Sequence, residues 1–232
     1  MKMFDNTKVA FKDKTDKDLS RAYFLFKTIS NPFISKTLTV FVKIALFFKL
    51  PISGLIKATV YKHFCGGTTI EDSQKTIDKL WKAHIGTILD FSAEGKETKE
   101  DFNRAMNETI ASIKKAKMES SIPFSVFKPT GLARFSLLEK ISNNSELSEN
   151  EKLEQSDFEN RIENICKTAS ENKVPVFIDA EESWIQNAID EIAIRMMRKF
   201  NQKEVFIFNT LQLYRHDRVK YLEDILITAR EE

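Results

Sequence analysis

From residue 84 onward, short apolar runs alternate with longer segments whose apolar positions recur at helical spacing. The apolar runs cover residues 84–92, 122–128, 174–179 and 205–210. The helical segments cover residues 96–117, 132–141, 150–172, 183–200 and 217–230. Short strands that alternate with helices are typical of βαβ units, in which the strands run parallel. We therefore expect an α/β fold with about four βα units.

The third apolar run narrows the choice of architecture. Residues 174–178 read VPVFI, without polar alternation, as in a parallel strand that is covered on both faces. Either an open doubly wound sheet or part of a (β/α)8 barrel fits such strands. No Gly-rich turn follows the first run, and this disfavours a nucleotide-binding open sheet.

The first 80 residues follow a different pattern, because residues 17–62 read as helices interrupted near two prolines. Residues 33–50 are apolar enough to raise the question of a membrane-spanning helix. At about 100° per residue, however, Lys36, Lys43 and Lys57 would share one stripe of a helix. We therefore expect an amphipathic helix rather than a span. A helix packed on the body of the protein is the alternative.

Charge is distributed unevenly along the chain. Residues 1–64 contain 12 Lys or Arg against 4 Asp, whereas the remainder contains 24 against 30 acidic residues. A basic segment indicates an anionic partner, and no nucleic-acid-reading motif accompanies these lysines. We expect peripheral membrane contact through residues 33–57 and no nucleic-acid partner. A solvated, lysine-rich helical face is the alternative.

The composition excludes several classes of protein. With 42% hydrophobic residues the chain is not intrinsically disordered. Cys65 and Cys166 lie far apart, so neither a disulfide scaffold nor a Cys-x-x-Cys site is expected, and no His/Cys cluster indicates a metal. The first 20 residues carry four Asp and lack an apolar core, unlike a secretory leader. We expect a cytoplasmic protein, with peripheral contact at the inner face of the membrane.

Polar residues follow each of the four predicted strands. They are Asp90 and Glu94 after the first, Lys128 after the second, Asp179, Glu181 and Glu182 after the third, and Asn209 and Gln212 after the fourth. In parallel α/β folds, chemistry gathers at the carboxyl ends of the strands. Helix caps and first-turn carboxylates would explain each position singly. Their coincidence at four strand ends predicts a site.

Three of these strand ends together resemble the proline dehydrogenase family. The resemblance rests on Lys128, on residues 177–184 (FIDAEESW) and on residues 207–214 (IFNTLQLY), and it spans about residues 70–232. It implies a (β/α)8 (TIM-like) barrel that binds FAD and oxidises L-proline to 1-pyrroline-5-carboxylate, with electrons passed to a membrane quinone. We accordingly expect a helical segment over residues 1–80 and barrel units over residues 81–232.

The resemblance also implies roles for individual residues. Lys128 would face the proline carboxylate, Asp179 would line the pocket beside the flavin, and Glu94 would pair with a substrate-binding arginine. Ala180 and Gln212 would join Asp179 in binding the cofactor, with Gln212 hydrogen-bonded to the isoalloxazine ring. The predicted catalytic residues are therefore Lys128, Asp179 and Glu94.

Later segments of the family are absent from the sequence, namely K-x-V-R-G-A-Y, S-H-N and R-R-x-x-E. We therefore expect the residues to correspond to the amino-terminal half of an incomplete barrel, and to be inactive alone. Two alternatives stay open. Lys128 could act as the Schiff-base nucleophile of an aldolase-type barrel, or the chain could be a non-catalytic half-barrel that assembles with a partner.

Overall fold

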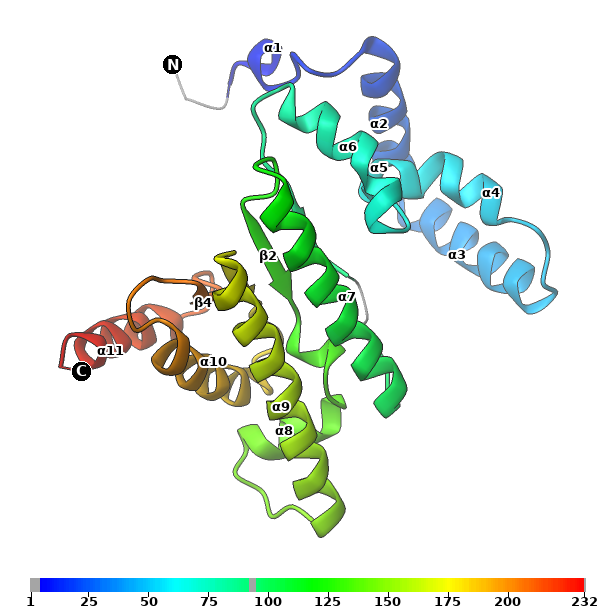
Figure 1. The fold of residues 1–232 in the computed structure, drawn as a ribbon. Coiled ribbons are helices and arrows are strands. Elements are labelled where there is room, and N and C mark those ends of the chain that lie inside the picture. Colours follow the sequence, from blue (N-terminus) through cyan, green and yellow to red (C-terminus); the bar gives the residue numbers. More distant parts are fainter. Residues whose placement is uncertain (1–4, 92–94, 232) are drawn as a thin grey trace. The chain divides into compact units, whose positions relative to one another are not determined.

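The computed structural model describes residues 5–91 and 95–231. Within these ranges the chain forms two compact units, divided between Ala83 and His84. The first unit consists of helices, and the second contains a sheet with its covering helices (Figure 1).

Several helices of the first unit begin where the sequence supplies a cap. Their bounds are α1 Thr7–Ala10, α2 Asp16–Ile29, α3 Pro32–Phe47, α4 Ser53–Ile56, η1 Lys57–Tyr61, α5 Lys62–Phe64 and α6 Ile70–Trp81. Thr15 and Asp18 form a reciprocal capping box at the start of α2. Asn31 caps α3, in which Pro32 occupies the first turn. Neither α2 nor α3 contains a buried residue.

The predicted lysine stripe is only partly correct. Lys36 and Lys43 share α3, but α3 ends at Phe47 and Lys57 begins the separate helix η1. The chain leaves the helix here because Lys49 adopts a left-handed conformation (φ 53°) and Pro51 follows. Across the part of the chain that the structure describes, no helix combines the length and hydropathy needed to cross a membrane.

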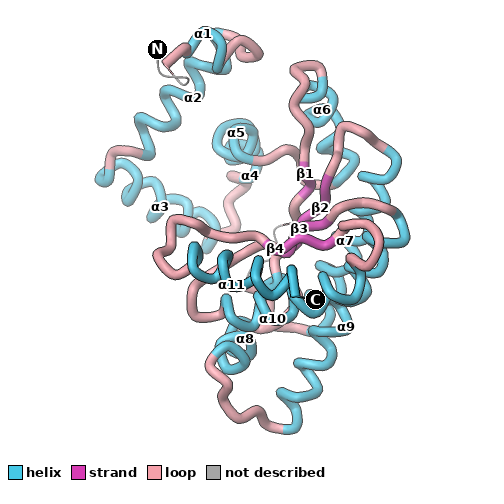
Figure 2. Tube along the Cα trace, turned by 90° about the vertical axis from the view of Figure 1, so that its left-hand side faces the viewer, coloured by secondary structure: helices cyan, strands magenta, loops and turns pink. Residues whose placement is uncertain are grey.

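The second unit contains four parallel strands in the order β1-β2-β3-β4 (Figure 2). They are β1 Ile88–Leu89, β2 Phe124–Phe127, β3 Val176–Ile178 and β4 Ile207–Asn209. The helices of this unit are α7 Lys99–Met118, η2 Pro129–Gly131, α8 Phe135–Ser142, α9 Glu149–Asn172, α10 Gln186–Phe200 and α11 Arg218–Glu231. Strands that neighbour one another in chain order belong to a barrel, whereas a doubly wound sheet reverses direction. The expected α/β fold, with a helical segment and four βα units in barrel order, is confirmed.

Several element boundaries differ from the predicted ones by a few residues, among them those of β1 and α10. The first strand pairs through Ile88 and Leu89, a shorter stretch than the predicted run of residues 84–92. Helix α10 begins at Gln186 instead of residue 183. The residues before it form a loop in which the Glu181 N–H donates to the Gln186 side chain.

Among the described residues of the second unit, helices pack on one face of the sheet, and aromatic side chains occupy the other face. Helix α7 packs on β2, α10 packs on β4, and α9 lies against α7 and α10. The predicted apolar face of α10 is buried from Ile185 to Met196 and half-buried at Phe200. On the opposite sheet face three half-buried rings from adjacent strands contact one another, those of Phe124, Phe177 and Phe208.

Candidate functional site

Lys128 and Asp179 directly follow β2 and β3, on the sheet face that the helices leave open. The residues before them, Phe127 and Ile178, are 3% and 0% exposed on the helix-covered face, and side chains alternate between faces along a strand. The Asp179 N–H donates to the Phe127 carbonyl oxygen over 3.0 Å and continues the ladder. Lys128 and Asp179 therefore lie at the same level on neighbouring strands, and both are half-buried.

Thr210, which directly follows β4, holds one oxygen of Asp179. Its hydroxyl accepts a hydrogen bond from the Ala180 N–H over 2.7 Å and lies 3.2 Å from Asp179 Oδ1 and 3.3 Å from the Ile178 carbonyl oxygen. Asp179 Oδ1 also accepts from the Ala180 N–H over 3.1 Å. Asp179 Oδ2 receives no hydrogen bond from the residues that the structure describes. Asp179 caps no helix, because α10 starts seven residues later without a side-chain cap.

Glu181 connects the ends of β2 and β3. Its carboxylate accepts a hydrogen bond from the Thr130 N–H over 2.9 Å and another from the Thr130 hydroxyl. Burial raises the pKa of the Glu181 carboxyl above its ordinary value, while the hydrogen bonds from Thr130 and the charge of Lys128 act in the opposite direction. The carboxylate of Glu181 is thus hydrogen-bonded to the turn after Lys128. Glu181 is not a first-turn residue of α10.

Gln212 lies in the loop after β4 and contacts the loop after β3. Its Nε2 donates to the Ala180 carbonyl oxygen over 3.1 Å. Among the described residues, none donates a hydrogen bond to its Oε1. The side-chain amide is therefore oriented by one bond and offers an acceptor, since the two ends of an amide cannot exchange roles here.

These side chains line one open hollow of about 1110 Å³ at the carboxyl ends of the strands. Lys128, Asp179, Ala180 and Gln212 all contribute to its wall. Glu94 lies outside the described residues, so its predicted position is not observed. The structure brings the four other predicted residues to the same hollow, while their individual roles stay predictions.

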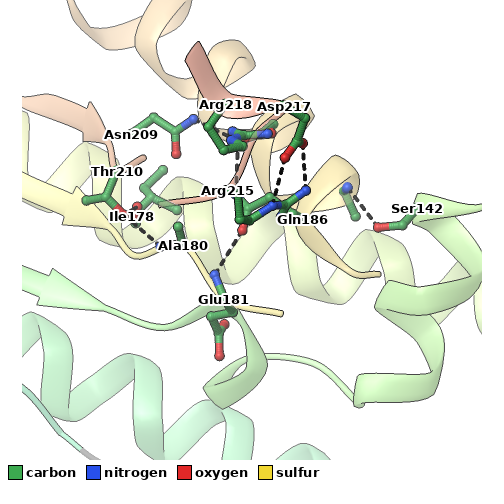
Figure 3. A network of polar contacts seen from close by, with 12 residues as sticks. Ser142, Ile178, Ala180, Glu181, Gln186, Asn209, Thr210, Arg215, Asp217 and Arg218 are labelled. Carbon is green, nitrogen blue, oxygen red and sulfur yellow. Dashed lines mark hydrogen bonds and ion pairs between the residues drawn. The ribbon is translucent and has the colours of Figure 1, made fainter. Parts of the chain in front are cut away.

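A buried polar network lies behind the strand ends (Figure 3). Asp190 on α10 and Arg218 on α11 form an ion pair over 2.8 Å, with both side chains almost completely buried. Gln186 Nε2 and Asn209 Nδ2 each donate to Asp190 Oδ1 over 3.0 Å. The network thus links two helices with the end of β4.

Sequence reasoning missed the residues that support the site. Thr130 and Thr210 were not predicted, although both lie within three residues of a strand end. For Asp190 the sequence does contain a signal, since Gln186 and Asp190 are spaced i, i+4 beside the apolar face of α10. Polar residues at that spacing within a buried helix indicate a satisfied internal network.

The comparison with known proteins identifies the family. A model of the proline dehydrogenase family matches residues 73–232. The chain is 31% identical over 171 residues to the carbapenem antibiotics biosynthesis protein CarD of Pectobacterium carotovorum subsp. carotovorum. This alignment covers 74% of this chain and 46% of that protein. The chain is 30% identical over 250 residues to the mitochondrial proline dehydrogenase 1 of Dictyostelium discoideum. That alignment covers 90% of this chain and 43% of the other protein.

A solved structure supports the fold. Proline utilization A from Bdellovibrio bacteriovorus, crystallised after inactivation by N-propargylglycine, aligns with a TM-score of 0.63 over 97% of this chain and 24% of that protein. The sequence identity is 14%, so this likeness concerns the fold alone. The chain spans less than half the length of the two curated relatives described above. Because the family model matches well over half of its residues, the chain belongs to the proline dehydrogenase family.

Proposed function

We propose that this chain forms one side of the site at which L-proline is oxidised to 1-pyrroline-5-carboxylate with FAD as cofactor. One observation carries the proposal: Lys128, Asp179 and Gln212 come from three successive strand ends and line a single hollow. Membership of the proline dehydrogenase family agrees with this chemistry. It also favours a dehydrogenase over the aldolase alternative for Lys128.

The residues present fit a flavin. The hollow, at about 1110 Å³, is slightly larger than the usual ligand site. Gln212 Oε1 offers it an acceptor, and the ring system of a flavin carries an N–H donor. The cofactor would be held by Asp179, Ala180 and Gln212. FAD, when bound, supplies the acceptor for the hydride of the substrate.

The chain's own residues bind and orient the substrate. The ammonium group of Lys128 attracts the carboxylate of L-proline, and its half-buried position strengthens that attraction relative to bulk water. Asp179, held at Oδ1 by Thr210 and the Ala180 N–H, directs Oδ2 toward the ring amine. The substrate is then oriented so that the ring carbon bonded to the amine is in position to lose a hydride. For Glu94 the resemblance alone supports a role, that of pairing with a substrate-binding arginine.

The test is substrate binding to the FAD-loaded chain, followed through the flavin absorbance band. Lys128→Met is expected to weaken L-proline binding about 10- to 100-fold, the effect of losing a charge-assisted hydrogen bond, and to leave FAD binding unchanged. Lys152→Met, which removes an exposed lysine paired with Glu149, is the matched control. Failure of the unmodified chain to bind FAD would contradict the proposal. So would equal L-proline affinities of the two variants.

For the electron acceptor we propose a quinone dissolved in a membrane, which residues 33–57 would contact. Helix α3 exposes apolar and basic side chains together, at Phe33, Phe41, Phe47, Lys36 and Lys43. Exposed aromatic residues mixed with lysines suit an anionic bilayer surface. Binding to vesicles that contain phosphatidylglycerol, but not to pure phosphatidylcholine vesicles, is the expected result. Loss of binding in Phe41→Asp would support α3 as the contact. A cytoplasmic location stays a prediction.

A further inference from the structure

Glu181 links the turn that follows Lys128 to the loop that follows Asp179. Its carboxylate accepts two hydrogen bonds from Thr130, which lies in η2 two residues beyond Lys128. Its own N–H donates to Gln186 Oε1 over 2.9 Å. A displacement of Glu181 would therefore shift residues at the ends of both β2 and β3.

Gln186 continues this connection into the interior. It is 1% exposed, and its Nε2 donates to Asp190 Oδ1. Asp190 is 4% exposed and is bound by Arg218, which is 3% exposed, and by Asn209 at the end of β4. An uninterrupted polar path therefore runs from the buried ion pair to three strand ends. Figure 3 labels four members of this path, Glu181, Gln186, Asn209 and Arg218.

The side-chain amide of Gln186 has a fixed orientation. Its oxygen accepts from a backbone N–H, and its nitrogen donates to a carboxylate. Exchanging the two ends would place an NH2 group against an N–H donor and an oxygen against a carboxylate. Gln186 therefore holds the backbone of Glu181 in one position relative to the ion pair.

We propose that Gln186 and Glu181 are positioning residues for Lys128 and Asp179, with the buried ion pair as the fixed end of the path. The inference rests on the proposed function and extends it, because it assigns the geometry of the site to residues that need not touch a ligand. Buried hydrogen-bond networks of this kind rigidify the surrounding structure, whereas a broken member leaves a further unpaired polar group.

The test compares two variants at the start of α10. Gln186→Met has nearly the same shape and removes the acceptor of the Glu181 N–H. Ser142→Ala removes the acceptor of the Ala188 N–H, a 3.0 Å bond at the same end of the helix but outside the path. Each variant leaves one backbone N–H without its side-chain acceptor, and Gln186→Met also removes the Nε2 donor to Asp190 Oδ1. A purely structural role for Gln186 would lower the free energy of unfolding and leave the FAD dissociation constant unchanged.

Two measurements separate the outcomes. Hydrogen exchange of the ligand-free chain should be at least about tenfold faster at the Glu181 and Thr130 amides in Gln186→Met than in Ser142→Ala. The FAD dissociation constant should rise about tenfold in Gln186→Met and remain near that of the unmodified chain in Ser142→Ala. Unchanged exchange at Thr130 would overturn the inference, and so would changed exchange with unchanged FAD affinity. If the unmodified chain binds no FAD, the proposed function fails, and the exchange at Thr130 alone then decides the inference.

Discussion

Replacing Arg218 by Met tests the energetics of the buried ion pair. Arg218 and Asp190 have side-chain exposures of 4% and 5%, and two hydrogen bonds of 3.0 and 2.8 Å join Arg218 Nη2 to the carboxylate. Removal of one partner from a buried pair costs about 3–5 kcal/mol, because the remaining charge loses its compensation. Gln186 and Asn209 still donate to Asp190 in this variant, so we expect about 3 kcal/mol, at the lower end of that range.

The assay is urea denaturation of the full chain, with the free energy of unfolding compared between variants. The matched control is Lys220→Met on the same helix, which breaks an exposed 3.0 Å pair with Asp224. Exposed pairs contribute about 0–1 kcal/mol, so the control should unfold almost as the unmodified chain does. If Arg218→Met does not fold, the double variant Asp190→Asn, Arg218→Met removes the buried charge and should recover part of the loss. Equal stabilities of Arg218→Met and Lys220→Met would refute the reasoning.

Two further predictions concern titration and thiol reactivity. Hydrogen bonds from Lys140 and Ser148 lower the pKa of Glu151 to about 2, so its contribution to stability is present above about pH 4.5 and is lost as the pH falls toward 2. Glu151→Gln should make the urea midpoint of unfolding less dependent on pH over this range. An unchanged pH dependence of the midpoint would contradict the assignment. Burial raises the pKa of the Cys166 thiol, whereas Cys65 is exposed. Iodoacetamide should therefore label Cys65 alone in the folded chain, as read by peptide mass spectrometry, and equal labelling would exclude a closed core around Cys166.

The order of strands and helices was predictable because each element carries its own periodicity. The apolar run VPVFI has no polar alternation, and the face of α10 repeats at helical spacing, so both were located from local pattern. The start of α10 was not predictable in this way, since Glu182 and Ser183 read as the first turn of a helix. The hydrogen bond from the Glu181 N–H to Gln186 keeps these residues in a loop, and tertiary contacts of this kind leave no local signature.

Candidate site residues were predictable where the topology alone places them. Lys128 and Asp179 follow strands directly, so the alternation of the strand sets the face on which they lie. The partnership of Thr130 with Glu181 joins residues 51 positions apart. It depends on the register between β2 and β3, which the sequence does not specify by itself.

The contacting rings of Phe124, Phe177 and Phe208 have a consequence for any molecule that enters between the strand tips. Each ring occupies its strand two or four positions before Asp179, Thr210 or Lys128, on the same side of the ribbon. A ligand that moved in from the strand tips would therefore pass the polar side chains first and reach these rings afterwards. This order of polar and aromatic side chains orients an amphipathic ligand before any specific bond forms. Its ionic groups face outward and its carbon skeleton faces inward.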